Sequence, residues 1–219
     1  GKRIENRRRR LSFGLALKQQ ICNIPCPLTP ELIEPFVRRT AKNPDRKLSK
    51  NDFETVIDVT FSNKGIKDIT PLTKFTSAEN ITLPDNLIAN LKPLANLKSL
   101  LGLQLQSNRI TDLKPLAGLT QLEQLNLSKN NITNISPLKK LVNLERLNLI
   151  NNNISSLSAL SEMKKLRWLG LNFNKIKNIE PLYELKNLRV LMLTNNVDLD
   201  YSDVEELQEI LPNCKIECN

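Results

Sequence analysis

The four cysteines are the residues whose type and spacing could do chemistry. Cys22 and Cys26 lie near the amino end of the 219-residue chain, and Cys214 and Cys218 lie near its carboxyl end. An even number of cysteines in two local pairs favours disulfides and a compartment outside the cytoplasm. The alternative is that the thiols are free and partly buried, with Cys214 packing as a small hydrophobic residue. The pattern leaves both alternatives open.

The pair at the amino end is the better candidate for a disulfide. If residues 214–218 form an extended strand, Cys214 and Cys218 lie about 13 Å apart, which is beyond the reach of a disulfide. We therefore predict that any bridge joins Cys22 to Cys26, and that the chain is secreted or displayed on a cell surface. A zinc site of four cysteines is not expected, because the long region between the pairs should keep them apart, and we predict no metal site.

Catalysis is not expected from the remaining side chains. The chain has no histidine, which excludes Ser-His-Asp and Cys-His arrangements and every metal site that uses histidine. Its six glycines form no glycine-rich phosphate loop. A site of paired carboxylates is conceivable, but the acidic residues fall on surfaces where a solvated charge is the simpler interpretation. We predict no enzyme activity, no cofactor and no small-molecule substrate.

Much of the positive charge is local. The first ten residues, GKRIENRRRR, carry six basic residues against one acidic residue, a net charge of +5 out of +9 for the whole chain. Arg7, Arg8, Arg9 and Arg10 could bind an anionic membrane or nucleic acid weakly. The alternative, which we favour, is a flexible arm or the remnant of a longer chain.

A 22-residue repeat organises most of the chain. From Leu122 the pattern L-x-x-L-x-L-x-x-N-x-I-x-x-I-x-P-L-x-x-L runs to Leu141, and copies begin at positions 56, 78, 100, 122, 144, 166 and 188. The end copies are degenerate, as at Lys64, where asparagine is expected. A period of this length is typical of a solenoid, in which each turn packs against its neighbours and the end turns face water.

Each position of the repeat has a physical task. The leucines of L-x-L belong to a short strand whose alternate side chains point into the coil. The asparagine can bond backbone groups of the turn that follows, and the Pro-Leu of the return leg fixes φ and closes the back of the core. The sequence therefore predicts an α/β solenoid, a curved rod of seven turns with a parallel sheet on its concave side.

The ends of the chain carry helix signals that would cap this rod. Start signals at Thr29 and Ser49 predict helices over about 30–41 and 50–56. At the other end, Ser202 is the expected N-cap of a helix that stops at Pro212, followed by a short extended tail. We predict a basic arm over 1–21, a helical cap over 22–55, repeats over 56–199 and a second cap over 200–219.

The 22-residue repeat with its Pro-Leu return, preceded by a helical cap running into VTFSNKGIKDITPL, resembles the internalin-like, SDS22-type class of leucine-rich-repeat proteins. The resemblance covers roughly residues 28–199. It implies a bacterial protein with a leucine-rich-repeat fold and a concave face that binds a protein partner. The chain differs from the internalins in its terminal helix and cysteine-containing tail, where an immunoglobulin-like domain usually follows, and this argues against carrying over a role in host-cell adhesion.

The outward positions of successive strands change character along the rod. The first four turns carry mainly small and polar residues there, whereas later turns carry larger ones, with Gly170 expected to leave open space between them. An exposed cluster of Trp, Phe, Met and Arg is the composition of a binding hot spot. Alternatively, Trp168 and Phe173 shield strand backbone or pack on the C-terminal cap. The predicted partner-binding residues are Arg146, Asn148, Ile150, Trp168, Asn172, Phe173, Val190 and Met192.

Two classes of function therefore remain. The first is a protein-binding module that uses its concave face, of which an intracellular phosphatase regulator, suggested by the SDS22-type resemblance, is one variant. The second is a scaffold that its basic arm tethers to an anionic membrane or nucleic acid, with the rod acting as a spacer.

Overall fold

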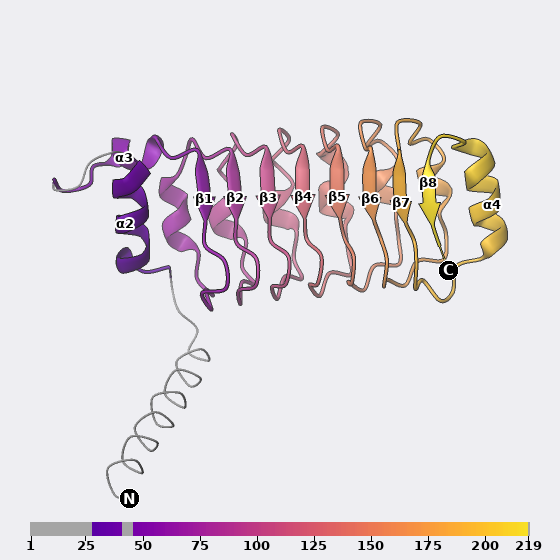
Figure 1. Ribbon diagram of the computed structural model, residues 1–219, viewed down its shortest axis with the longest axis horizontal. Helices are drawn as coiled ribbons and strands as arrows, with labels where there is room; N and C mark the ends of the chain where they lie inside the picture. Colours follow the sequence, from indigo (N-terminus) through magenta and orange to yellow (C-terminus); the bar gives the residue numbers. More distant parts are fainter. Residues whose placement is uncertain (1–27, 41–45, 219) are drawn as a thin grey trace, which may run out of the picture.

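Eight parallel strands in one open sheet form the body of the protein. The computed structural model describes residues 28–40 and 46–218. Each strand pairs with the next one along the chain (Figure 1). The strands are β1 (Asp58–Thr60), β2 (Asn80–Thr82), β3 (Gly102–Gln104), β4 (Gln124–Asn126), β5 (Arg146–Asn148), β6 (Trp168–Gly170), β7 (Val190–Met192) and β8 (Lys215–Glu217).

The register of the sheet equals the period of the sequence. Residues 22 positions apart are Cα partners from β1 to β7, as Leu125 is with Leu147. The middle residue of each of these strands is buried, and the leucines and isoleucines of the repeat fill a continuous core along the rod. The predicted leucine-rich-repeat solenoid is confirmed.

Short 3-10 helices return the chain to the next strand. They are η1 (Thr70–Lys74), η2 (Lys92–Leu94), η3 (Lys114–Leu116), η4 (Ser136–Lys140), η5 (Ser158–Leu160) and η6 (Glu180–Leu182). All but η5 have proline within their first two positions, where its fixed φ suits a helix start and its missing N–H costs no hydrogen bond. The leucine after each proline is buried and closes the back of the core.

A buried asparagine in each of six successive turns bonds that turn to the one before it. In the turn of β4, Nδ2 of Asn130 donates to the carbonyl oxygens of Leu105 in the preceding turn (3.1 Å) and of Leu127 in its own (3.0 Å), while Oδ1 accepts from the N–H of Ile110 (2.9 Å). The sequence predicted bonds within one turn, and the structure adds the bonds between turns. The six residues are Asn86, Asn108, Asn130, Asn152, Asn174 and Asn196.

Two helices close the amino end of the core. Helix α2 spans Pro30–Thr40 and α3 spans Lys50–Glu54, so each ends one or two residues earlier than predicted. Phe36 of α2 packs against Phe61, with ring centroids 5.2 Å apart. The helices thereby cover the apolar end of the first turn.

Helix α4 (Tyr201–Ile210) and strand β8 close the other end. The prediction that Ser202 caps α4 is wrong, because Asp200 is the N-cap and its Oδ1 accepts from both the N–H (2.9 Å) and the hydroxyl (2.8 Å) of Ser202. The predicted extended tail is part of the sheet, because it pairs with β7 as an eighth strand.

The two cysteines of this cap are free. Cys214 is buried in the core and Cys218 is exposed. Burial raises the pKa of the Cys214 thiol to about 11, although nearby Arg189 opposes the shift. Cys214 therefore packs as a small hydrophobic residue. Cys22, Cys26 and the basic residues from Arg7 to Arg10 lie outside the described residues, so the predicted bridge and arm stay predictions.

Candidate partner-binding surface

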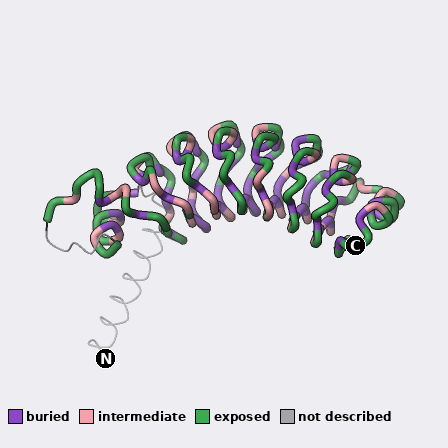
Figure 2. The backbone as a smooth tube through the Cα atoms, turned by 90° about the horizontal axis from the view of Figure 1, so that it is seen from above, coloured by how far each residue is buried: buried purple, intermediate pink, exposed green. Residues whose placement is uncertain are grey.

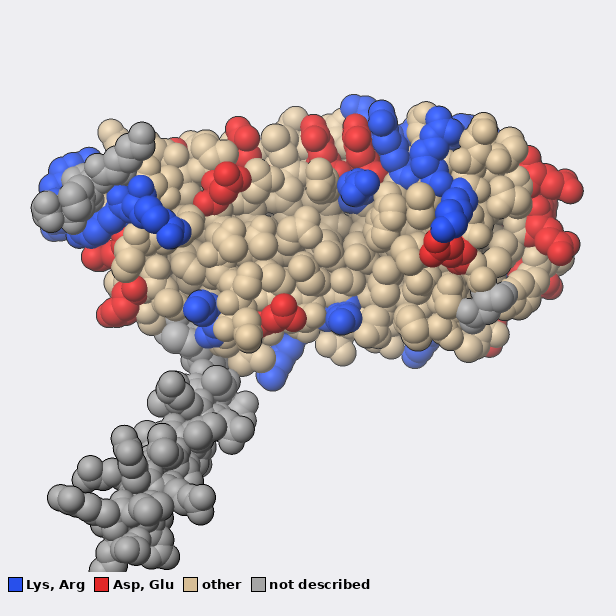
Figure 3. Space-filling view, viewed as in Figure 1, with Lys and Arg blue, Asp and Glu red and all other residues tan. Residues whose placement is uncertain are grey.

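The sheet lines the inner side of a curved rod. Figure 1 shows the strands in front of the 3-10 helices, and Figure 2 shows the coil bending toward the strand side. Because side chains alternate across a strand, the first and third residues of each strand face outward from this concave side. Figure 3 shows a mostly uncharged surface across the middle of this face, with charged residues gathered at its edges and ends.

A groove on this face brings three of the predicted residues together. Arg146, Asn148 and Trp168 line it, and its volume is about 280 Å³. Its other lining residues are Gln104, Gln124, Leu125 and Asn126. The groove therefore crosses four adjacent strands, from β3 to β6.

The predicted open space at Gly170 is filled. A Cβ placed on Gly170 would lie 2.6 Å from Cη2 of Trp168 and 3.0 Å from Cδ1 of Ile150. The indole of Trp168 therefore reaches along its own strand and covers the glycine. Gly170 is buried beneath it, while Trp168 is partly exposed. The absence of a side chain at Gly170 therefore makes room for the Trp168 ring, and no open space remains there.

The remaining predicted residues lie beside the groove. Val190 is the register partner of Trp168, and Met192 is the partner of Gly170. Both are partly exposed. In the turn after β6, Oδ1 of Asn172 accepts a hydrogen bond from the N–H of Thr194 (2.9 Å). Val190 and Met192 therefore place apolar side chains on the strand next to Trp168, on the C-terminal side of the groove.

Comparison with known proteins agrees with this architecture. The family model for leucine-rich repeats in two copies matches residues 98–139, 120–162 and 164–209, together more than half of the chain. Internalin C2 from Listeria monocytogenes is 30% identical over 84% of this chain and 90% of that one, with a TM-score of 0.66. The chain belongs to the internalin-like leucine-rich-repeat proteins.

Two further solved structures resemble parts of this internalin-like protein. The internalin inlF from Listeria monocytogenes has a TM-score of 0.76 and 28% identity over 89% of this chain, which spans 58% of its length. A leucine-rich-repeat protein of Leptospira interrogans has a TM-score of 0.65 and 25% identity, with 80% of this chain covering 52% of that one. A comparison with the curated proteins found no match.

One turn of this internalin-like protein carries an unusual side chain. The residue seven positions after each repeat start has a positive φ, between 51° and 58°. Asn, Asp, Ser or Lys occupies this left-handed position in the other turns, but Phe173 occupies it in the turn of β6, at φ 57°. A bulky residue is disfavoured in this conformation. The Phe173 side chain is also 54% exposed, so core packing does not account for its presence.

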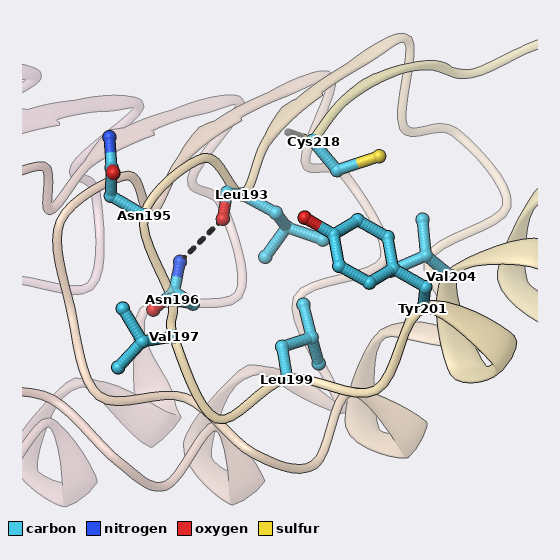
Figure 4. Close-up of a pocket in the computed structure, with 8 residues that line it drawn as sticks. All are labelled: Leu193, Asn195, Asn196, Val197, Leu199, Tyr201, Val204 and Cys218. Atoms are coloured by element: carbon cyan, nitrogen blue, oxygen red, sulfur yellow. Dashed lines mark hydrogen bonds between the residues drawn. The ribbon is translucent and has the colours of Figure 1, made fainter.

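A second hollow lies at the C-terminal edge, away from the predicted residues. The ring of Tyr201 lies among Leu199, Val204 and Cys218 (Figure 4), and the cavity measures about 70 Å³. That volume is enough for only a few water molecules. Nearby, Nδ2 of Asn196 donates to the carbonyl of Leu193 at 2.7 Å, which closes the last turn. We assign no binding role to this hollow.

Sequence reasoning missed three residues of the groove. Gln104, Gln124 and Asn126 line it, but they were grouped with the small polar residues of the early turns. The repeat register could have identified them, because each occupies an outward position on a strand one or two places from that of Arg146. Across residues 28–40 and 46–218, no cluster of metal-ligating side chains occurs and no helix is long and apolar enough to cross a membrane.

Proposed function

We propose that this protein is a binding module that takes a protein partner on the concave face of β4 to β7 and performs no catalysis itself. The observation that carries the proposal is Phe173, which combines a disfavoured backbone conformation with an exposed aromatic ring. Strain of this kind persists where function requires it. Leucine-rich-repeat proteins generally act through protein–protein interaction, which supports the same conclusion.

The surface around Phe173 has the composition of an interface centre. Aromatic residues, Met and Arg are enriched in such centres, where a few side chains supply most of the binding free energy. Trp168, Met192 and Arg146 supply these residue types on three adjacent strands. We also propose that the protein acts outside the cytoplasm, because a bridge between Cys22 and Cys26 would form in an oxidising compartment.

The test is a capture experiment with Phe173→Asn and a matched control. Asparagine occupies the same left-handed position in other turns, as at Asn151 and Asn195. The variant should therefore be as stable as the wild type or more stable by about 1 kcal/mol. The control is Tyr201→Ala, which removes an aromatic ring of similar exposure, 56%, on α4.

Immobilised wild type and Tyr201→Ala should capture the same protein partner, and Phe173→Asn should lose most of it. Thermal unfolding of all three proteins checks that they are folded. Equal capture by the three proteins would place the interface elsewhere and refute the proposal.

A further inference from the structure

The groove on β3 to β6 presents more hydrogen-bond donors than acceptors, because two of its four side-chain amide oxygens, those of Asn126 and Asn148, are already bonded, whereas those of Gln104 and Gln124 are not bonded within the described residues. Oδ1 of Asn126 accepts from the N–H (3.1 Å) and hydroxyl (2.9 Å) of Ser128, and Oδ1 of Asn148 accepts from the N–H of Ile150 (3.1 Å). Their oxygens are thus engaged, while the Nδ2 groups have no partner within the described chain. Arginine and the indole nitrogen only donate, so Arg146 and Trp168 add donors and no acceptors.

Arg146 is a cation without a counter-charge. Of the outward strand positions from β1 to β7, only Asp58 and Arg146 are charged, and Asp58 accepts a hydrogen bond from Asn80 at 2.8 Å. Arg146 is exposed and forms no ion pair or hydrogen bond within the described residues. The adjacent Glu145 is engaged elsewhere, since its carboxylate lies 3.7 Å from Nε of Arg167. Glu123, at the same strand edge, has no ion pair with Arg146.

An apolar wall stands on one side of this cation. Arg146 and Trp168 are Cα partners in the register of β5 and β6, and Ile150 packs where Trp168 covers Gly170. Apolar neighbours exclude water and thereby strengthen a charge-assisted hydrogen bond. A ligand seated here would therefore meet an exposed guanidinium flanked by amide donors, with an indole on the neighbouring strand.

We infer that this groove binds the carboxylate of an aspartate or glutamate side chain from an acidic segment of the partner protein. The inference rests on the proposed function and names the partner chemistry at that site. Arginine matches the two oxygens of a carboxylate in a bidentate pair, and the free amide groups of Asn126 and Asn148 supply further donors. A volume of about 280 Å³ is near the lower end of small-molecule pockets and suits one anchoring side chain of a larger ligand. A phosphate group fits less well, because it carries up to two negative charges and the groove lining contains one cation, Arg146.

The probe is a displayed library of random peptides, selected on the immobilised wild-type protein. Peptides that bind the groove should be enriched in Asp or Glu beside an apolar residue. Arg146→Gln should lower the affinity of a selected peptide about tenfold or more and weaken its dependence on salt. The control Arg189→Gln removes the same charge beside β7, outside the groove lining and without disturbing the pair between Glu145 and Arg167, and should change affinity less than about twofold.

A double-mutant cycle assigns the contact. Replacing the acidic residue of the peptide by its amide should lower the affinity for the wild-type protein. The same replacement should have little effect on the affinity for Arg146→Gln, because that variant has already lost the contact. If peptides bind and Trp168→Ala weakens them, but Arg146→Gln and the amide peptide do not, the carboxylate inference is wrong and the proposed interface stands. If no selected peptide responds to any of these concave-face changes, both are wrong. Competition by an oligosaccharide rich in uronic acids, with no acidic peptide selected, would overturn the assignment to a protein partner.

Discussion

At the scale of single residues, neighbouring positions of one turn perform opposite tasks. Asn130 and its equivalents are buried, and both the oxygen and the nitrogen of the side-chain amide form hydrogen bonds. These residues therefore join neighbouring turns of the coil. Trp168 faces outward from the sheet, and Phe173 is exposed in the turn that follows the same strand. Changes at the first kind of position should alter the free energy of unfolding, and changes at the second should alter binding.

Asn130→Ala should destabilise the protein by about 2–3 kcal/mol. The change leaves the carbonyls of Leu105 and Leu127 and the N–H of Ile110 buried without their partner, and unsatisfied buried groups of this kind are costly. The adjacent Asn131→Ala is the control, because Asn131 is exposed and should change stability by less than about 0.5 kcal/mol. Urea unfolding of both variants measures the difference. Equal stabilities would contradict the structural role given to the asparagines.

The sequence predicts residues of the first kind better than those of the second. Leu125 and Asn130 recur every 22 positions, so repetition identifies their tasks without coordinates. Gly170 does not recur, and its environment depends on where the Trp168 ring turns. That direction is a packing outcome, and sequence reasoning predicted open space where the indole in fact lies. The groove was missed for the same reason, because its shape depends on side chains from four strands.

At the scale of elements, the helices of the caps depend on short-range electrostatics. Asp52 in α3 accepts hydrogen bonds from the N–H (2.7 Å) and hydroxyl (2.8 Å) of Ser49 and pairs with Arg46 at 2.7 Å. The hydrogen bonds from Ser49 are the main cause that lowers the pKa of Asp52, and Arg46 adds to it. The helix start predicted at Ser49 is therefore present and is reinforced by a capping box with Asp52, whereas the cap predicted at Ser202 lies two residues earlier, at Asp200.

Stability of the amino-terminal cap should fall on acidification. Because the folded-state pKa of Asp52 lies below its ordinary value of about 3.9, its contribution is present above that value and is lost as the pH falls through the folded pKa. Asp52→Asn should therefore be less stable than the wild type at pH 6, and the difference should shrink toward pH 3. Urea unfolding at both pH values measures this. A difference that does not change with pH would show that the charge of Asp52 plays no part.

At the scale of the whole molecule, the repeat yields a long face whose two halves differ. The turns up to β4 present polar side chains, and the turns from β5 to β7 present Arg146, Trp168, Val190 and Met192. The curvature of the sheet turns these strands toward the inner side of the rod (Figure 2). The number of turns and the parallel sheet followed from the period of the sequence, because a 22-residue unit can bury its leucines only by stacking. The eighth strand could not be predicted from the repeat, because residues 215–217 do not continue the 22-residue period.

The most direct test of the concave interface is Trp168→Ala, measured for partner binding and for unfolding on the same preparation. Binding to the captured partner should weaken by about 2 kcal/mol or more. The free energy of unfolding should change by no more than about 1 kcal/mol, because the partly exposed indole covers Gly170 and lies outside the leucine core. If Trp168→Ala instead unfolds the protein while each folded molecule binds as before, Trp168 is a structural residue and the proposed interface is wrong.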